Sequence, residues 1–203
     1  MNEIIIAILF IIVGYVSGSV LYGYWIPKIL KNADVYEDSK DHNPGISNAF
    51  HYGIGVGLIT VICDVCKAHL PVTLAFKILS TKNPLLPFVI LAPVLGHCYP
   101  IFNRKGGKAI GPSAGIGVAI CKFSPTPLIF MLTCYLIFSL VICITNFAVR
   151  IIALYSVTTI VTFITCPFMV GVGILFIAIL VSYKHILSTE DWSCNIEFLK
   201  NYF

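Results

Sequence analysis

Charged residues are scarce in this chain: aspartate, glutamate, lysine and arginine make up 11% of its 203 residues, whereas hydrophobic residues make up 58%. A soluble domain carries roughly a quarter charged residues, because its surface must be solvated. The deficit excludes an ordinary water-soluble domain and predicts a surface that mostly faces hydrocarbon. The apolar runs are continuous and do not alternate with period two, so they do not have the pattern of a transmembrane β-barrel.

Metal-ligand clusters and a cleavable leader are also missing from the sequence. Cys63 and Cys66 form one C-x-x-C, but no second pair or group of histidines accompanies it, so neither a metal nor another cofactor is expected. The net charge of +4 is modest and fits basic cytoplasmic loops, and no nucleic-acid partner is expected. Residues 1–3 offer no basic region and no A-x-A-like site follows, which indicates that the chain begins with its first span.

What the sequence does contain is a series of apolar stretches. A helix needs about 20 apolar residues to cross a bilayer of about 30 Å. The pattern predicts an all-α membrane protein with about seven transmembrane helices, folded as a single polytopic domain over residues 1–203. The predicted spans are 3–25, 53–79, 85–102, 109–122, 127–146, 150–165 and 168–184.

The basic residues predict how these spans are oriented. With seven spans and the N-terminus outside, nine lysines and arginines fall on the cytoplasmic side, three fall outside, and Lys67 lies within a span. Such an excess is typical of cytoplasmic loops. The polar loop at about 28–51 and the tail at about 184–203 are then both cytoplasmic. Because every polar motif gathers on this face, we expect a cytoplasmic active or binding site.

The segment 96–108, G-H-C-Y-P-I-F-N-R-K-G-G-K, has the composition of an anion site. Gly106 and Gly107 let the backbone turn so that successive N–H groups point at one anion, and Lys105 and Lys108 supply charge. A helix start at residue 109 or 110 suits a phosphate. The alternative is a topogenic basic loop with a Gly-Gly turn.

A second polar segment lies just before the second span. Asn43, Ser47 and Asn48 are short hydrogen-bonding side chains that can hold a polar ligand. Alternatively, Ser47 or Asn48 only caps the helix that follows.

Three further ionisable residues have positions that indicate function. Asp64 and Lys67 lie three apart inside the second span, so they share one helix face and can pair. Charges at membrane depth are functional hypotheses, although a structural ion pair is the alternative. His185 lies at the cytoplasmic end of the last span, where a surface role is the competing interpretation.

Taken in order, these segments resemble the bacterial acyl-phosphate:glycerol-3-phosphate acyltransferase family of membrane proteins. N-P-G-I-S-N at 43–48 is similar to its N-x-G-A-T-N, and D-V-C-K-A at 64–68 to its D-x-x-K-G. G-H-C-Y-P at 96–100 and K-G-G-K at 105–108 are similar to its G-H-x-x-P and K-G-G-K-G. The resemblance extends from residue 14 to about residue 185.

The resemblance implies a seven-helix enzyme that uses neither metal nor nucleotide. Its substrates would be acyl phosphate and an acceptor, which is glycerol 3-phosphate or another molecule. The enzyme would be surrounded by membrane lipid. It would transfer a fatty acyl group to the 1-hydroxyl of glycerol 3-phosphate, giving lysophosphatidate and phosphate. Acyl phosphate is an activated mixed anhydride, so the protein need only orient two phosphates and stabilise the developing oxyanion.

The resemblance also implies roles for particular residues. The substrate-binding residues would be Asp64, Lys67, His97, Lys105, Gly106, Gly107 and Lys108. The catalytic residues, which position the acceptor, would be Asn43, Asn48, Ser156 and His185.

Several positions depart from the family pattern, among them Asp41, His51, Pro112 and Ala153, which replace a serine, an arginine, a threonine and a serine. They leave open a catalytically silent or acceptor-switched relative with a lipid-binding or regulatory role. A transporter is disfavoured, because only Asp64 and Lys67 lie deep in the membrane.

Overall fold

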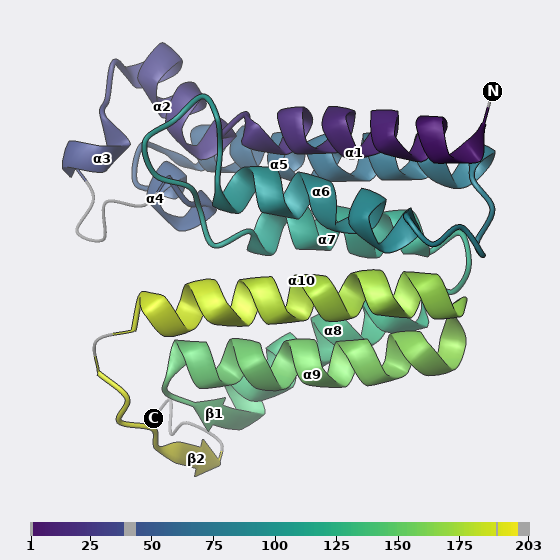
Figure 1. Ribbon diagram of the computed structural model, residues 1–203. Helices are drawn as coiled ribbons and strands as arrows, with labels where there is room; N and C mark the ends of the chain where they lie inside the picture. Colours follow the sequence, from purple (N-terminus) through teal and green to yellow (C-terminus); the bar gives the residue numbers. More distant parts are fainter. Residues whose placement is uncertain (1, 39–43, 190, 199–203) are drawn as a thin grey trace.

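The computed structural model describes residues 2–38, 44–189 and 191–198 (Figure 1). Its helices are α1 (Glu3–Ser19), α2 (Tyr22–Lys31), α3 (Val35–Asp38), α4 (Ile46–Phe50), α5 (Ile54–Ile78), α6 (Leu86–Cys98), α7 (Ile110–Ile120), α8 (Thr126–Leu136), α9 (Phe147–Thr165) and α10 (Phe168–Leu187). A π-helical turn, η1 (Ile137–Val141), leads from α8 into strand β1 (Ile142–Ile144), and β2 (Ile196–Phe198) lies near the C-terminus.

Within these described residues, three helices are long and apolar enough to cross a membrane: α5, α9 and α10. The pair α1 and α2 passes the same test together but is bent by 41° at the break between them. Three apolar helices are shorter: α6, α7 and the continuous segment Thr126–Val141. Helix length alone therefore gives three spans, or four with the bent pair, and does not confirm the predicted seven.

Local sequence signals set the helix boundaries. The Asn2 side chain accepts a hydrogen bond from Ile4 N at the start of α1, and Asn146 accepts from the backbone N–H groups of Ala148 and Val149 at the start of α9. Asparagine is a favoured N-cap because it satisfies these otherwise unpaired donors. Pro167 precedes the first residue of α10, where its missing N–H costs nothing.

The helices form two layers (Figure 1). One contains α1, α5, α6 and α7, and the other contains α8, α9 and α10, with α10 packed against both α9 and α6. Glycines allow α1 and α6 to approach closely. A Cβ on Gly18 would lie 2.0 Å from the carbonyl oxygen of Pro93, and one on Gly96 would lie 2.1 Å from that of Tyr15. Small residues at helix crossings are typical of membrane bundles.

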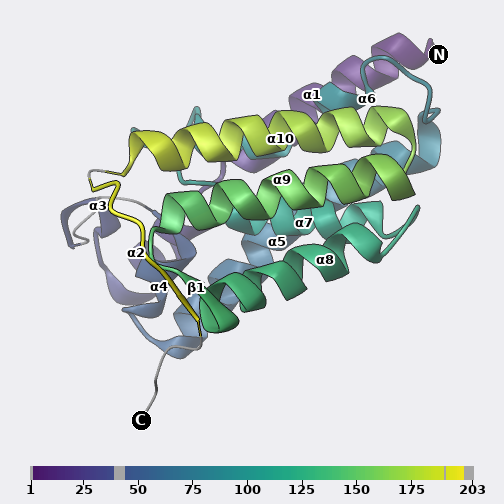
Figure 2. The same ribbon diagram turned by 90° about the horizontal axis from the view of Figure 1, so that it is seen from below.

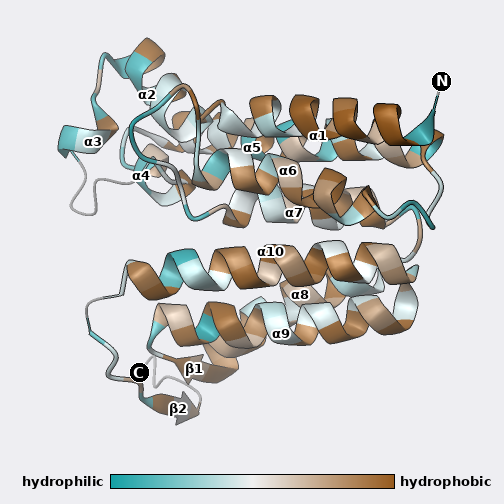
Figure 3. Ribbon diagram, viewed as in Figure 1, coloured by the Kyte–Doolittle hydropathy of each residue, from teal (hydrophilic) through white to brown (hydrophobic). Residues whose placement is uncertain are grey.

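Polar residues gather at one end of the bundle. Figure 3 shows hydrophobic residues along α1 and hydrophilic ones around α2, α3 and the loop that joins α6 to α7. The N-terminus lies at the opposite end (Figure 1). Large apolar side chains such as Ile4, Ile8 and Ile12 are about half exposed, as expected of a surface in contact with lipid.

The C-terminal segment corrects the prediction of a purely helical chain. It crosses the end of α9 (Figure 2), and β2 pairs antiparallel with β1, with Ile144 opposite Ile196. The predicted span 127–146 is therefore helical only as far as Val141. Beyond it, Thr145 N donates to Asn195 O at 3.1 Å, so the tail supplies the backbone partners that a continued helix would have supplied.

Candidate active site

A cavity of about 360 Å³ lies at the polar end of the bundle. Its wall is assembled from the segment around α4 and from six separate helices or helix ends, α5 to α10. The lining residues are Gly45, Ile46, Ser47, Phe50, Asp64, His97, Lys108, Ala109, Ile110, Gly111, Tyr135, Phe147 and His185. Five residues singled out in the sequence thus meet at one place: Ser47, Asp64, His97, Lys108 and His185.

The predicted pairing of Asp64 with Lys67 is confirmed. The Lys67 Nζ lies 2.7 Å from Asp64 Oδ1, and both side chains are buried. The same ammonium donates to the carbonyl oxygen of Val20 at 2.7 Å and contacts His97 Nδ1 at 2.9 Å. A buried charge is costly unless it is paired and hydrogen-bonded, and here every contact of the ammonium is to an acceptor. The pair therefore connects α5 to α6 and to the end of α1.

The two glycines of the K-G-G-K loop are required by close packing. A Cβ on Gly106 would lie 2.1 Å from the carbonyl oxygen of Cys98, and one on Gly107 would lie 2.1 Å from His97 Nε2. Gly107 N also donates to the carbonyl oxygen of His97 at 3.0 Å. Neither glycine is in the left-handed region, which is instead occupied by Ala109 at φ 60°. The loop is thus folded back onto the end of α6, and α7 begins at Ile110 as predicted.

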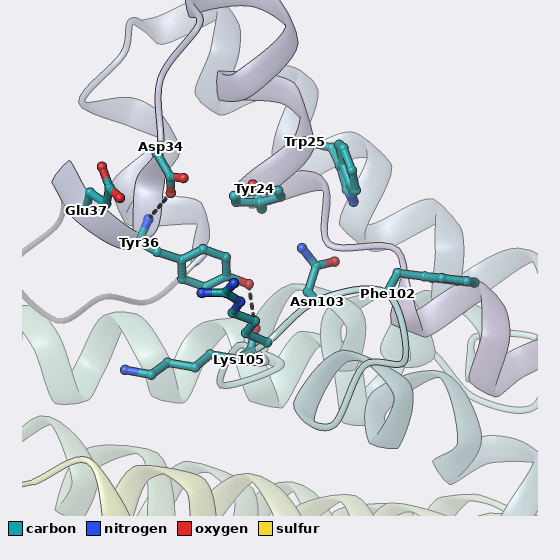
Figure 4. Close-up of a pocket in the computed structure, with 9 residues that line it drawn as sticks. Tyr24, Trp25, Asp34, Tyr36, Glu37, Phe102, Asn103 and Lys105 are labelled. Atoms are coloured by element: carbon teal, nitrogen blue, oxygen red, sulfur yellow. Dashed lines mark hydrogen bonds between the residues drawn. The ribbon is translucent and has the colours of Figure 1, made fainter.

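The two lysines of this loop line different pockets. Lys108 lines the cavity, whereas Lys105 lines a second pocket of about 730 Å³ together with Tyr24, Trp25 and Phe102 (Figure 4). In this pocket Tyr36 donates a hydrogen bond to the carbonyl oxygen of Lys105 at 2.8 Å. Burial raises the pKa of Tyr36, so its hydroxyl remains a donor at neutral pH. The structure therefore does not bring Lys105 and Lys108 to one pocket.

His185 is a cavity residue and does not lie on the surface. Its side chain is 1% exposed, and its ring packs edge-on against Phe147 with the centroids 5.3 Å apart. No hydrogen-bond partner of its Nε2 is present among the described residues. A buried ring nitrogen without a partner, at the wall of a cavity, is suited to a ligand hydroxyl.

Other predicted site residues lie elsewhere. Ser156 is exposed on α9 and donates back to the carbonyl oxygen of Ile152 at 2.8 Å. It is nine residues from Phe147, which places it on the opposite side of the helix from the cavity. Asn48 is half-buried in α4 and does not line the cavity. Asn43 and Asp41 lie outside the described residues.

Sequence reasoning missed two of the lining residues, Tyr135 and Phe147. They come from α8 and α9, and neither belongs to a motif. An aromatic residue at the end of an apolar stretch has the appearance of an ordinary interfacial anchor. Only the tertiary structure distinguishes them: both line the cavity, and Phe147 packs against His185.

Comparison with known proteins identifies the family. The fold is that of an integral membrane acyltransferase: the sequence model for "Glycerol-3-phosphate acyltransferase" matches residues 8–191. Glycerol-3-phosphate acyltransferase 2 of Thermotoga maritima is 33% identical over 181 residues, covering 87% of this chain and 88% of its own length. The chain therefore belongs to the glycerol-3-phosphate acyltransferase family, as the motifs predict.

Two solved structures of the same kind of protein agree. PlsY, described as an integral membrane glycerol 3-phosphate acyltransferase, has been solved in a glycerol 3-phosphate form. It matches with a TM-score of 0.77 and 28% identity over 89% of this chain and 88% of its own. Its lysophosphatidic acid form matches with a TM-score of 0.71 and 26% identity over 91% and 88%. The protein is accordingly a multi-pass membrane protein.

Proposed function

We propose that this chain transfers a fatty acyl group from acyl phosphate to glycerol 3-phosphate, giving lysophosphatidate and phosphate. The observation that carries the proposal is the cavity, where Asp64, His97, Lys108 and His185 converge from different parts of the chain. PlsY has been solved in a glycerol 3-phosphate form and in a lysophosphatidic acid form, which correspond to the acceptor and the product of this reaction. The curated relative from Thermotoga maritima carries the acyltransferase name, and no finding favours a silent relative.

The proposed reaction is a direct acyl transfer from an activated donor. The acceptor hydroxyl attacks the acyl carbonyl carbon, the bond from that carbon to the phosphate oxygen breaks, and phosphate leaves with the electron pair. Lys108 provides a positive charge for the phosphate, beside the backbone of Gly107. The unpartnered Nε2 of His185 accepts a hydrogen bond from the attacking hydroxyl. This hydrogen bond orients the hydroxyl, and Nε2 takes up its proton as the hydroxyl attacks. Orientation and charge stabilisation are sufficient for an activated anhydride.

The acceptor would approach from the side of α4. Ser47 lines the cavity there, and Asn43 and Asn48 flank it in the sequence. We propose that these side chains contact the glycerol portion of the acceptor. Ser156 has no place in this arrangement, because its hydroxyl lies on an exposed face of α9.

We further propose that the chain is one polytopic domain of seven spans with an outer N-terminus. The bent pair, the three long helices and the three shorter apolar helices together supply seven segments. The polar end then faces the cytoplasm, with the loop at 28–51 and the tail at 184–203 on that side. Glu37→Cys and Lys82→Cys, made in a cysteine-free background, test this in intact cells. The probe at 82 should react with an impermeant maleimide and the probe at 37 should not, and the reverse pattern would overturn the orientation.

The activity is tested with purified protein and palmitoyl phosphate, with glycerol 3-phosphate, with glycerol, or with neither acceptor. Phosphate release should depend on glycerol 3-phosphate, and lysophosphatidate should form in equal amount. Release that depends on glycerol but not on its phosphate would indicate an acceptor-switched enzyme. No release with either acceptor, from protein whose thermal unfolding is cooperative, would overturn the proposal.

A further inference from the structure

The Lys67 ammonium has two hydrogen-bond partners and one ion-pair partner. It lies 2.7 Å from Asp64 Oδ1, 2.7 Å from the carbonyl oxygen of Val20 and 2.9 Å from His97 Nδ1. A lysine ammonium has three donors and no acceptor. Each of its two hydrogen-bond partners, the Val20 carbonyl oxygen and the histidine nitrogen, must therefore present a lone pair.

This assignment decides which nitrogen of His97 carries the ring proton. Because Nδ1 accepts from Lys67, it cannot carry a proton, and a neutral imidazole then has its proton on Nε2. Asp64 Oδ1 is 4.0 Å from Nδ1, which is beyond hydrogen-bond reach, so the carboxylate does not hold the ring directly. Asp64 acts on His97 only through Lys67.

Nε2 is the ring nitrogen on the side of the K-G-G-K loop. Nε2 lies against Gly107, where a Cβ would come within 2.1 Å of it, and the ring lines the same cavity as Lys108 and His185. We propose that Asp64 and Lys67 are positioning residues that fix His97 as a neutral Nε2–H donor to an oxygen of the bound acyl phosphate. The proposal rests on the function proposed above.

The proposed arrangement gives the two cavity histidines different roles, one as a hydrogen-bond donor and the other as an acceptor. His97 has no free lone pair, so it can donate a hydrogen bond but cannot serve as a base. His185, whose Nε2 has no partner among the described residues, retains the accepting role. The competing interpretation is that Asp64 and Lys67 only stabilise the fold, in which case changing them would alter stability but not the state of His97.

The first test observes the ring itself. In protein with ¹⁵N-labelled histidine, at neutral pH and without substrate, His97 should show an unprotonated Nδ1 and a protonated Nε2, assigned by its loss in His97→Gln. In Lys67→Met, the signal should change to a mixture of tautomers or to the Nδ1–H form. If Lys67→Met fails to fold because Asp64 is left uncompensated, the double variant Asp64→Leu/Lys67→Met removes both charges and serves instead. An unchanged Nε2–H tautomer in the folded variant would overturn the proposal.

The second test uses the two amide side chains as substitutes for the two ring nitrogens. Glutamine places an amide donor near the position of Nε2, whereas asparagine reaches only that of Nδ1. His97→Gln should retain more kcat than His97→Asn, which should lose about 10²–10³-fold, the loss measured when one oxyanion donor is removed. KM for glycerol 3-phosphate should change little in either. Equal losses in the two variants would refute the donor role.

Lys122→Met is the matched control. Lys122 Nζ also donates to a backbone carbonyl, that of Phe76, but it lies beyond the end of α7 that is remote from the cavity. It should leave the His97 signals and kcat unchanged. The tautomer is measured without substrate, so it can be read independently of activity. An inactive wild type with the Nε2–H tautomer would refute the proposed function alone. An active wild type with the Nδ1–H tautomer would refute this inference alone.

Discussion

Gly107→Ala isolates one contact of the site, because it adds a single methyl group at a residue whose backbone conformation suits alanine. The added Cβ would lie 2.1 Å from His97 Nε2, 2.9 Å from Cδ2 and 3.0 Å from Cε1. Favourable contacts between heavy atoms begin at about 3.5 Å, so the ring or the loop must move by about 1.4 Å. The ring is not free to retreat, since Nδ1 is held at 2.9 Å by Lys67.

The expected result is a large loss of rate with a smaller loss of stability. Overpacking of this kind costs about 1–3 kcal/mol of folding free energy. A misplacement of about 1 Å near the reacting groups can cost about 10²-fold in rate. The measurements are kcat with palmitoyl phosphate and glycerol 3-phosphate, and thermal unfolding in detergent. Gly55→Ala is the control, because its Cβ would meet no atom within 4 Å on the exposed start of α5, and it should keep full activity.

A double variant checks that the loss arises at His97. When His97→Ala is already present, the clash is gone, so adding Gly107→Ala should cost little more. Fully additive losses would show that the methyl group acts elsewhere. Wild-type kcat in the single variant Gly107→Ala would refute the described packing of the loop.

Three other outcomes follow from the same geometry. Lys108→Ala should weaken binding of a non-reactive acyl phosphonate by about 1.5–3 kcal/mol, the range for hydrogen bonds to charged groups. Lys105→Ala should weaken it less, because Lys105 lines the other pocket. Equal losses of binding free energy in titration calorimetry would contradict the assignment of the two lysines to separate pockets. Ser156→Ala should leave kcat unchanged, since its hydroxyl is turned to its own helix, and a tenfold fall would place it in the site after all. Arg150→Met should lower the unfolding temperature, because its guanidinium donates to Ser139 Oγ at 3.0 Å, and Ser139→Ala should have little further effect once Arg150 is replaced.

Much of this protein could be predicted from short-range pattern. The apolar stretches gave the positions of the helices, because a chain in hydrocarbon must satisfy its backbone internally. The spacing of Asp64 and Lys67 predicted their pairing, because residues three apart on a helix share a face. The Gly-Gly pair at 106–107 predicts a turn that could bind an anion, and the structure adds that both glycines pack closely against the end of α6 without a positive φ.

The sequence by itself determined where the helices form, which residues are charged at membrane depth and which motifs belong to the family. These follow from hydropathy and local spacing, which are properties of neighbouring residues. Only the tertiary structure decided that His97 accepts from Lys67, that Lys105 and Lys108 line separate pockets, and that His185 is buried against Phe147. It also decided that residues 142–144 form a strand, because their partners lie more than 50 residues further along the chain. Such contacts depend on how helices pack across the bundle, and that packing is not encoded in any one segment.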